Sequence, residues 1–318
     1  MDTFVIMLKN VLTFVLLAIP GYLLVKGRIL GPRESVTLSK VLTNLGMPFL
    51  ILSTTLKLEL GGGFTLSLLL VGILGTVILV AAFLSSALLV RKEKNIKTKN
   101  MIRFCMVFAN NGFLGIPLAR AVFGDSSGVM AYVIVMNIVM NVLAFTLGAH
   151  LISGDKSAIN IKKAFLSPVF LSFLAGIGLN LLKVDSVLPE LQTYATHFSG
   201  IVTPLSMVVL GMKLCEVPLK KLFSSGRMYY VSAVRLILFP VAGVALAFAL
   251  SKIPFLPLTG DSVLGLFVGL AMPTAGLSSV FADQYNGDSE HAVILTLGTT
   301  LLSIVTIPTL YWLICTVL

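Results

Sequence analysis

The sequence predicts an all-α protein that crosses a membrane many times, and three observations support this fold class. Of the 318 residues, 57% are hydrophobic and only 11% are charged, whereas soluble proteins contain about 25% charged residues. Mean hydropathy is +1.02. Apolar stretches of about 20 residues, the length that a helix needs to cross a bilayer, follow one another along the whole chain. Little sequence remains for a soluble domain.

Ten such stretches can be marked, and each is predicted to form one membrane helix. They cover residues 4–25, 36–56, 64–90, 102–123, 129–152, 164–182, 198–217, 228–251, 262–282 and 291–317. The first has no basic run before it and no small-residue cleavage pattern, so we expect a retained helix rather than a signal peptide. The three cysteines (Cys105, Cys215 and Cys315) all fall in apolar stretches, which predicts neither a disulfide framework nor a metal site.

Basic residues are concentrated in alternate connections between these stretches. The Lys and Arg residues outside the stretches fall mainly in connections 26–35, 91–101, 153–163 and 218–227. The connections on the opposite side contain only Lys57, Lys183 and Lys252. Because basic connections remain in the cytoplasm, we expect a cell-membrane protein with both termini outside and with membrane lipid as its neighbour. No basic stripe with interleaved aromatic residues indicates a nucleic-acid partner.

Two pairs of similar motifs indicate that the chain contains two related halves. Pro48 precedes Lys57 by nine residues, and Pro204 precedes Lys213 by nine. Gly-Asp-Ser occurs at 124–126 and again at 287–289, an alignment that puts Pro273 opposite Asn110 and Val280 opposite Pro117. The halves 1–155 and 156–318 then contain five stretches each. Because five is odd, the second half is inverted relative to the first, an architecture typical of secondary transporters.

The fourth and ninth stretches contain residues that disfavour a continuous helix. These residues are Asn110, Asn111, Gly112 and Pro117 in the fourth stretch, and Pro273, Thr274, Gly276, Ser278 and Ser279 in the ninth. Pro117 cannot donate to the carbonyl of Phe113, and its fixed φ suits the first turn of a new helix. Freed backbone groups are costly in hydrocarbon unless protein or cavity water satisfies them. We therefore expect both stretches to unwind near the midplane, to cross there and to line a shared cavity.

Such a cavity could bind an anion or a cation. The N-termini of the second half-helices carry partial positive charge and, with the Asn and Ser side chains, form a receptor for a carboxylate. Unwound carbonyls could instead hold a cation. For any single proline the alternative is a kink that neighbouring helices satisfy. Pro48 and Pro204 are interpreted as matching kinks beside the crossing, with contact to the ligand left open.

Ionisable residues inside membrane stretches are functional candidates by default. Arg120 either attracts anions or extends to the outer interface beside Asp125, and Asp283 either takes up a proton or is an ordinary helix-end charge. We expect Arg235 and Lys213 to extend their side chains to the cytoplasmic interface. Two further polar residues, Asn137 and Asn141, are expected to hydrogen-bond between helices.

These motifs resemble those of the auxin efflux carrier family, which includes plant auxin exporters and bacterial malate and malonate permeases. The most telling pieces are NNGFLGIPLARAVFG, MPTAGLSSVFADQYNGD and GMPFLILSTT, and the similarity covers essentially the whole chain. The resemblance implies a scaffold of helices one, two, six and seven with a dimer interface, and a transport domain of the other six. It matches Asn110 to the asparagine that faces the substrate, and Pro117 and Pro273 to the prolines of the crossing. Connection 153–163 is short, unlike that of the plant exporters, which favours the bacterial branch.

The resemblance implies a secondary active or facilitative transporter of small organic anions that works by alternating access as a homodimer. No cofactor is expected, and a coupling ion, H⁺ or Na⁺, is left open. An enzyme is not expected, because the sequence shows no catalytic triad, metal spacing, paired carboxylates or nucleotide-binding loop. The alternative is a membrane receptor or a sterol- or lipid-binding module of the same fold. The lack of a fused soluble domain to relay a signal disfavours it.

Overall fold

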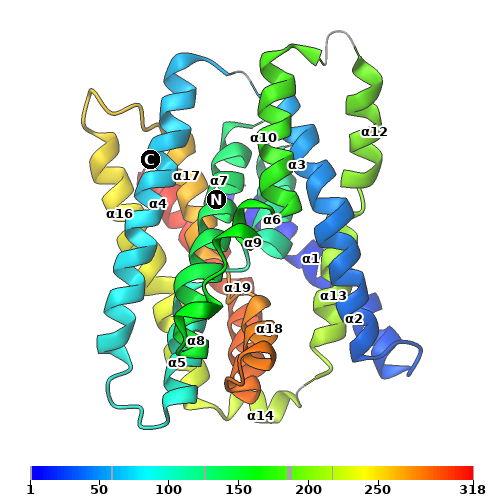
Figure 1. Cartoon of the computed structure of the whole chain (residues 1–318), viewed down its shortest axis with the longest axis vertical. Coiled ribbons are helices and arrows are strands. Elements are labelled where there is room, and N and C mark those ends of the chain that lie inside the picture. Colours follow the sequence, from blue (N-terminus) through cyan, green and yellow to red (C-terminus); the bar gives the residue numbers. More distant parts are fainter. Residues whose placement is uncertain (1, 59, 125–126, 185–187, 217, 318) are drawn as a thin grey trace.

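A computed structural model describes residues 2–58, 60–124, 127–184, 188–216 and 218–317. The described residues form helices and connections, with one isolated antiparallel bridge between Ala109 and Thr274. Most helices run roughly along the long axis of the molecule (Figure 1). This arrangement agrees with the all-α, multi-spanning fold that the composition predicts.

Eight helical stretches in the described part of the chain are long and apolar enough to cross a membrane. They are Met7–Lys26, Glu34–Leu56, Gly63–Leu89, Gly128–Ser153, Lys156–Leu181, Pro189–Lys213, Gly226–Ser251 and Ser289–Val317. Three are single helices, namely α1 (Asp2–Lys26), α4 (Gly62–Leu89) and α19 (Ser289–Val317). The others consist of α2 (Pro32–Val41) with α3 (Met47–Leu56), α7 (Gly128–Leu143) with α8 (Ala149–Ser153), α9 (Ile161–Phe165) with α10 (Pro168–Leu181), α12 (Pro189–Ser199) with α13 (Val202–Lys213), and α15 (Gly226–Ala233) with α16 (Phe239–Ser251). The short α14 (Leu219–Phe223) precedes α15.

Two further apolar segments are interrupted, and they coincide with the fourth and ninth predicted stretches. The first consists of α5 (Ile96–Val107) and α6 (Ile116–Phe123), and the second of α17 (Gly260–Ala271) and α18 (Leu277–Gln284). Helix α5 starts six residues before the predicted start of the fourth stretch, because the Asn95 side chain accepts from the N–H groups of Lys97 and Thr98 at 3.0 and 3.3 Å. An N-cap of this kind satisfies donors that have no intrahelical partner.

Short π-helical turns precede three of the helix prolines. The turns η1 (Leu42–Gly46), η2 (Asn111–Gly115) and η5 (Val234–Leu238) each end two residues before a proline: Pro48, Pro117 and Pro240. Proline has no N–H, and its ring meets the carbonyl of the preceding turn. A wider turn with i to i+5 bonds accommodates both. The helix that was expected to begin at Pro117 therefore begins at Asn111, and Pro117 lies inside it.

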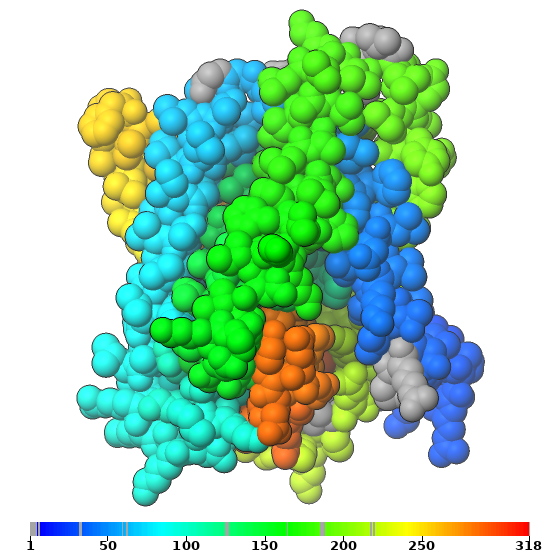
Figure 2. Space-filling view, in the orientation of Figure 1, coloured from blue at the N-terminus to red at the C-terminus, as the bar shows by residue number. Residues whose placement is uncertain are grey.

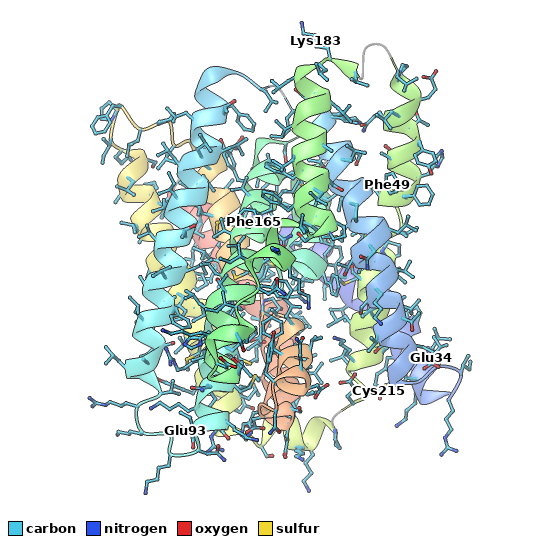
Figure 3. All side chains as sticks on the ribbon, in the orientation of Figure 1. Glu34, Phe49, Glu93, Phe165, Lys183 and Cys215 are labelled. Carbon is cyan, nitrogen blue, oxygen red and sulfur yellow. The ribbon has the colours of Figure 1, made fainter. Side chains whose placement is uncertain are left out.

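The sixth helix differs most from its predicted course. After α8 the chain turns back, and the Asn160 N–H donates to the carbonyl of Phe145 at 3.1 Å. Figure 3 places Phe165, at the end of α9, about halfway between Lys183 at one end of the molecule and Glu93 at the other. Connection 153–163 was expected to be an ordinary cytoplasmic loop. Its last residues, including Lys162 and Lys163, instead lie in α9 at mid-height.

Glycines allow close packing among helices of the expected scaffold. A Cβ atom at Gly211 of α13 would lie 1.8 Å from the carbonyl oxygen of Ala18 in α1, and one at Gly21 would lie 2.0 Å from the oxygen of Val208. A Cβ at Gly176 of α10 would lie 1.7 Å from the Thr55 hydroxyl of α3. Small residues at such contacts are typical of helix pairs in membranes.

The charge-based orientation predicts which end of the molecule is accessible from each side of the membrane. Figure 3 places Glu93, the neighbour of Lys94, at the opposite end of the molecule from Lys183. Glu190 lies in the first turn of α12, which begins shortly after Lys183 at that same end. In a variant whose natural cysteines are replaced by serine, Lys94→Cys should react with an impermeant maleimide only from the cytoplasmic side. Glu190→Cys should react only from outside. Labelling of Lys94→Cys from outside intact cells would show that the orientation is the reverse of the predicted one.

Candidate functional site

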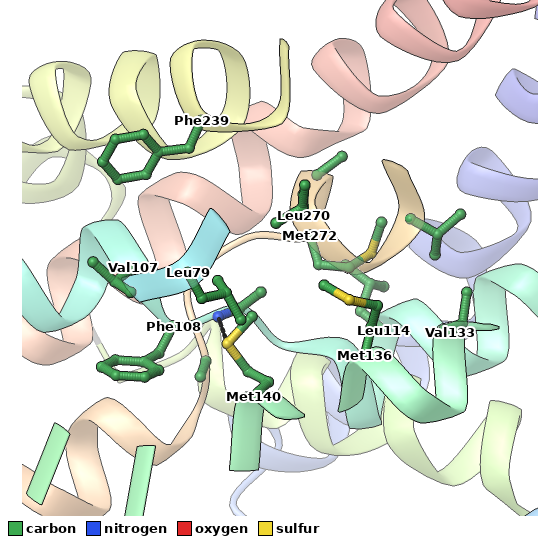
Figure 4. Close-up of a cluster of buried hydrophobic side chains, with 14 of the residues drawn as sticks. Leu79, Val107, Phe108, Leu114, Val133, Met136, Met140, Phe239, Leu270 and Met272 are labelled. Atoms are coloured by element: carbon green, nitrogen blue, oxygen red, sulfur yellow. Dashed lines mark hydrogen bonds between the residues drawn. The ribbon is translucent and has the colours of Figure 1, made fainter. Parts of the chain in front are cut away.

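The two interruptions meet and satisfy each other's backbone. The Asn110 N–H donates to the carbonyl of Pro273 at 2.8 Å, and the Ala275 N–H donates to the carbonyl of Phe108 at 2.8 Å. The Ala109 N–H lies 3.4 Å from the sulfur of Met140, the contact drawn as a dashed line in Figure 4. An unpaired backbone group in a membrane costs several kcal/mol, so this small bridge makes both interruptions tolerable. The Gly-Asp-Ser alignment had placed Pro273 opposite Asn110, and these two residues are hydrogen-bonded partners.

Hydrogen bonds of hydroxyl side chains hold the residues next to the bridge in place. The Thr274 hydroxyl donates to the carbonyl of Cys105 at 2.8 Å, and the Thr274 N–H donates to the Thr299 hydroxyl at 3.1 Å. The hydroxyls of Ser278 and Thr296 lie 2.7 Å apart. All of these side chains are buried. Thr274 and Ser278, predicted as ligand contacts, therefore hold the interrupted segments against α5 and α19.

The expected position of Arg235 was wrong. Its side chain was expected to reach the cytoplasmic interface, but it is fully buried. Its guanidinium donates to the carbonyls of Met272 at 3.0 Å, Leu270 at 2.8 Å and Val107 at 3.0 Å, with Met106 at 3.5 Å. These carbonyls belong to the ends of α17 and α5, where the last turn of a helix has no intrahelical donor. The two interruptions supply a dense set of acceptors, which explains why the arginine is retained inside.

A cavity of about 770 Å³ lies beside the bridge. Its lining from the interrupted segments comprises Phe108, Ala109, Asn110, Gly112, Phe113, Ala275, Gly276, Leu277, Val280 and Phe281. Residues of α2, η1, α7, α9 and α10 form other parts of the wall, together with Lys213 at the end of α13. In the space-filling view, the green segment that contains α9 lies just above the orange α18 on the viewed face (Figure 2). Three of the predicted site residues, Asn110, Gly112 and Gly276, line this cavity.

Amide groups gather at the end of the cavity nearest the bridge. The Asn110 Oδ1 accepts from the N–H of Phe113 at 3.4 Å, which caps the new half-helix and leaves Nδ2 available to a ligand. The buried Asn137 has an Nδ2 without a hydrogen-bond partner among the described residues. A Cβ atom on Gly112 would lie only 3.6 Å from the Asn137 Oδ1. Asn141 donates back to Asn137, at 2.9 Å to its carbonyl and 3.3 Å to its Oδ1. We call Asn110, Gly112, Asn137 and Asn141 the amide pole.

Lysines supply the charge of the cavity. Lys40, Lys162, Lys163 and Lys213 are among the lining residues, and the described lining contains no Asp or Glu. The Lys163 Nζ lies 5.2 Å from the centre of the Phe145 ring. We call these four residues the cavity lysines. Sequence reasoning treated Lys162 and Lys163 as topology signals, because periodicity cannot show that a connection folds inward. It expected Lys213 to reach the interface and did not single out Lys40.

Several other predicted site residues do not line the cavity. These are Asn111, Pro48, Pro117, Pro204, Pro273, Ser279, Arg120 and Asp283. The Asn111 side chain is fully buried, and neither of its polar atoms has a partner in the described part of the chain. Arg120 donates to the carbonyl of Ser199 at 2.9 Å and lies 3.5 Å from its hydroxyl, so it joins α6 to the end of α12. Its other expected neighbour, Asp125, lies outside the described residues. Asp283 is exposed and accepts from the Ser289 hydroxyl at 2.7 Å.

The described residues contain no group of three His, Cys, Asp or Glu side chains that could hold a metal ion. The polar chemistry near the bridge therefore comes from amides, hydroxyls, backbone groups and cationic side chains. Such an arrangement can bind and orient an anion by hydrogen bonds and charge.

Comparison with known proteins identifies the family of the chain. Residues 6–311 match the family Mem_trans, described as "Membrane transport protein". The chain is 26% identical over 302 residues to an "Uncharacterized transporter" of Methanothermobacter thermautotrophicus, which covers 94% of this chain and 96% of that relative. It is also 26% identical over 249 residues to a "Putative malonate transporter" of Rhizobium meliloti, with coverage of 76% and 75%. The chain therefore belongs to the membrane transport protein family, the auxin efflux carrier family that its motifs resemble.

Proposed function

We propose that the protein is a secondary active or facilitative carrier of small organic anions, with its substrate site in the cavity beside the bridge. The observation that supports this most is the charge of that cavity. Four lysines line it without an acidic lining side chain in the described part of the chain. Cations held in a partly enclosed site without counter-charge are unfavourable. An anionic substrate would supply the missing charge.

The amide pole would orient one carboxylate. A carboxylate accepts several hydrogen bonds, and the Nδ2 atoms of Asn110 and Asn137 are donors not used in other side-chain contacts within the described residues. The half-helix that begins at Asn111 adds the partial positive charge of its N-terminus. Backbone and amide donors bind the anion without the desolvation cost of a further buried ammonium group.

The cavity lysines would attract the anion and supply its counter-charge. Sites for small molecules typically enclose about 300–1,000 Å³, and a cavity of about 770 Å³ has room for a hydrated dicarboxylate. A dicarboxylate would place one charged group at the amide pole and the other against lysines of the lining. The relative described as a malonate transporter, malonate being a dicarboxylate, supports this substrate class.

The distribution of contacts supports alternating access with an inward-open state. Lys213 lines the cavity at the end of α13, which precedes the basic connection 218–227. Toward the opposite end, Arg120 links α6 to Ser199 of α12. We propose ten passes in two inverted halves, 1–155 and 156–318, with interrupted segments that cross at the midplane. Helices one, two, six and seven would form the scaffold of a homodimer in the cell membrane, both termini would lie outside, and the remaining six helices would move.

The rival proposal is a receptor or a lipid- or sterol-binding module. In its favour is an apolar crevice of about 220 Å³ between α1 and α13 on one side and α6 and α19 on the other. Its lining includes Phe14, Leu118, Met207 and Ile304. A crevice of this kind suits a hydrocarbon chain, whereas the lysine-lined cavity does not.

Counterflow in proteoliposomes distinguishes the two proposals. Vesicles loaded with a labelled mono- or dicarboxylate should exchange it for unlabelled acid outside, and the exchange should saturate. The double variant Lys162→Gln/Lys163→Gln should weaken apparent affinity by about tenfold or more, since one hydrogen bond to a charged group is worth about 1.5–3 kcal/mol. Lys156→Gln is the matched control, because Lys156 is exposed on the same connection and does not line the cavity.

Two results would contradict the carrier proposal. The first is a complete lack of exchange across a broad panel of organic acids, together with tight binding of a sterol or lipid. The second is a double lysine variant that exchanges acids with the affinity of the Lys156→Gln control, which would remove Lys162 and Lys163 from the site.

A further inference from the structure

A positively charged side chain of the protein lies where the two interrupted segments meet. Arg235 is fully buried, and its hydrogen-bond partners are the carbonyl oxygens of Met106, Val107, Leu270 and Met272. No salt bridge of Arg235 occurs among the described residues. A buried arginine usually has an acidic partner. Here backbone carbonyls take that role.

These carbonyls form the kind of site that binds a cation. They lie at the C-terminal ends of α5 and α17, where the helix dipole places partial negative charge. In carriers with broken helices, unwound carbonyls and half-helix C-termini coordinate Na⁺. In this chain the Arg235 guanidinium occupies such a set of oxygens, and its N–H donors are spread over a planar group.

We propose that Arg235 is a tethered cation that takes the place of a coupling metal ion between the two interrupted segments. The carrier then binds no Na⁺ at this position, and its transport does not depend on Na⁺. This inference rests on the proposed function, and it addresses how the site is held rather than which anion it binds. Arg235 is a positioning residue, because it fixes the ends of α5 and α17 and through them the bridge at Asn110 and Pro273.

Arginine suits this position better than lysine would. Arginine remains charged in proteins and offers five N–H donors in a fixed plane, which matches acceptors that come from two separate segments. Lysine offers three donors on one atom. A metal ion could serve the same oxygens, but it would leave and return with each cycle, whereas the guanidinium stays.

The first arm of the test uses the wild-type protein. Counterflow should be equal within about twofold in Na⁺, K⁺ and choline media of matched ionic strength, since screening then stays constant. The thermal unfolding midpoint in detergent should likewise not rise when Na⁺ replaces choline. A clear Na⁺ requirement, or a Na⁺-dependent rise in the midpoint, would overturn the inference. The unfolding measurement needs no transport, so it remains informative even if the carrier proposal fails.

The second arm removes the tethered cation. Arg235→Ala should lose about tenfold or more of the counterflow rate, and millimolar guanidinium should restore part of it by filling the vacated space. Guanidinium should also raise the unfolding midpoint of this variant. Arg103→Ala is the control, because Arg103 donates to Ser86 and Phe83 on α4, away from the bridge. Equal responses of the two variants to guanidinium would contradict a specific role for Arg235.

Discussion

Asn110→Asp is expected to abolish measurable substrate binding while the protein remains folded. Aspartate retains an oxygen that can accept from the N–H of Phe113, the contact that Asn110 Oδ1 makes at 3.4 Å, and Asp is as good an N-cap as Asn. The substitution replaces the free Nδ2 donor by a second, negatively charged acceptor. The lost bond alone corresponds to about 10- to 150-fold in affinity, and repulsion between two carboxylates adds to it.

Calorimetric titration with an acid identified by counterflow measures this effect. Asn110→Ala should lose about 10- to 150-fold, because it removes the hydrogen bond without adding repulsion. Asn95→Asp is the matched control, since Asn95 also caps a helix, at Lys97 and Thr98, but does not line the cavity. Wild-type affinity in well-folded Asn110→Asp would exclude Asn110 from substrate contact.

Gly211→Ala should cost a large part of the stability. The added methyl group would lie 1.8 Å from the carbonyl oxygen of Ala18 and 2.8 Å from its carbonyl carbon. These are backbone atoms of α1, so relief requires α1 and α13 to move apart. Overpacking typically costs about 1–3 kcal/mol and occasionally more, and a clash with backbone belongs at the upper end. The gain of about 1 kcal/mol from replacing glycine in a helix does not compensate.

The unfolding midpoint in detergent, measured by circular dichroism, tests this prediction. Gly178→Ala is the control, because a Cβ atom at Gly178 of α10 would meet nothing within 4 Å. That variant should be as stable as wild type or up to about 1 kcal/mol more stable. If Gly211→Ala matched Gly178→Ala, the close approach of α1 and α13 would not be present in the folded protein.

The sequence alone determined that the chain is an all-α, multi-spanning membrane protein and where two of its apolar segments are interrupted. Apolar length and the scarcity of charge leave few alternatives to membrane helices. Asn110, Gly112 and Pro273 mark the interruptions because their backbone or side-chain chemistry disfavours a continuous helix. Helix ends were less accurate: the seventh segment starts at Pro189 rather than 198, since its polar first turns lack an apolar signal.

Pro117 was correctly predicted to disturb the helix, but the new helix does not begin at this residue. Its missing N–H disrupts the ordinary hydrogen-bond pattern wherever it lies in a helix. Only the coordinates show that the π-helical turn η2 absorbs this disruption and that the interruption itself lies at residues 108–110. The residue type predicts that the helical hydrogen-bond pattern is disrupted. The backbone conformation that accommodates the disruption is set by the surrounding structure.

The partners of the charged residues were decided by tertiary structure. Arg235 could have reached the interface or remained inside, and the choice depended on free carbonyls of two other segments, 35 to 37 and 128 positions away. Lys162 and Lys163 became cavity residues because connection 153–163 folds back against Phe145. Hydropathy and charge spacing report the environment of each segment separately. The site depends on which segments meet, and that is fixed by hydrogen bonds and packing between residues that are not neighbours in the sequence.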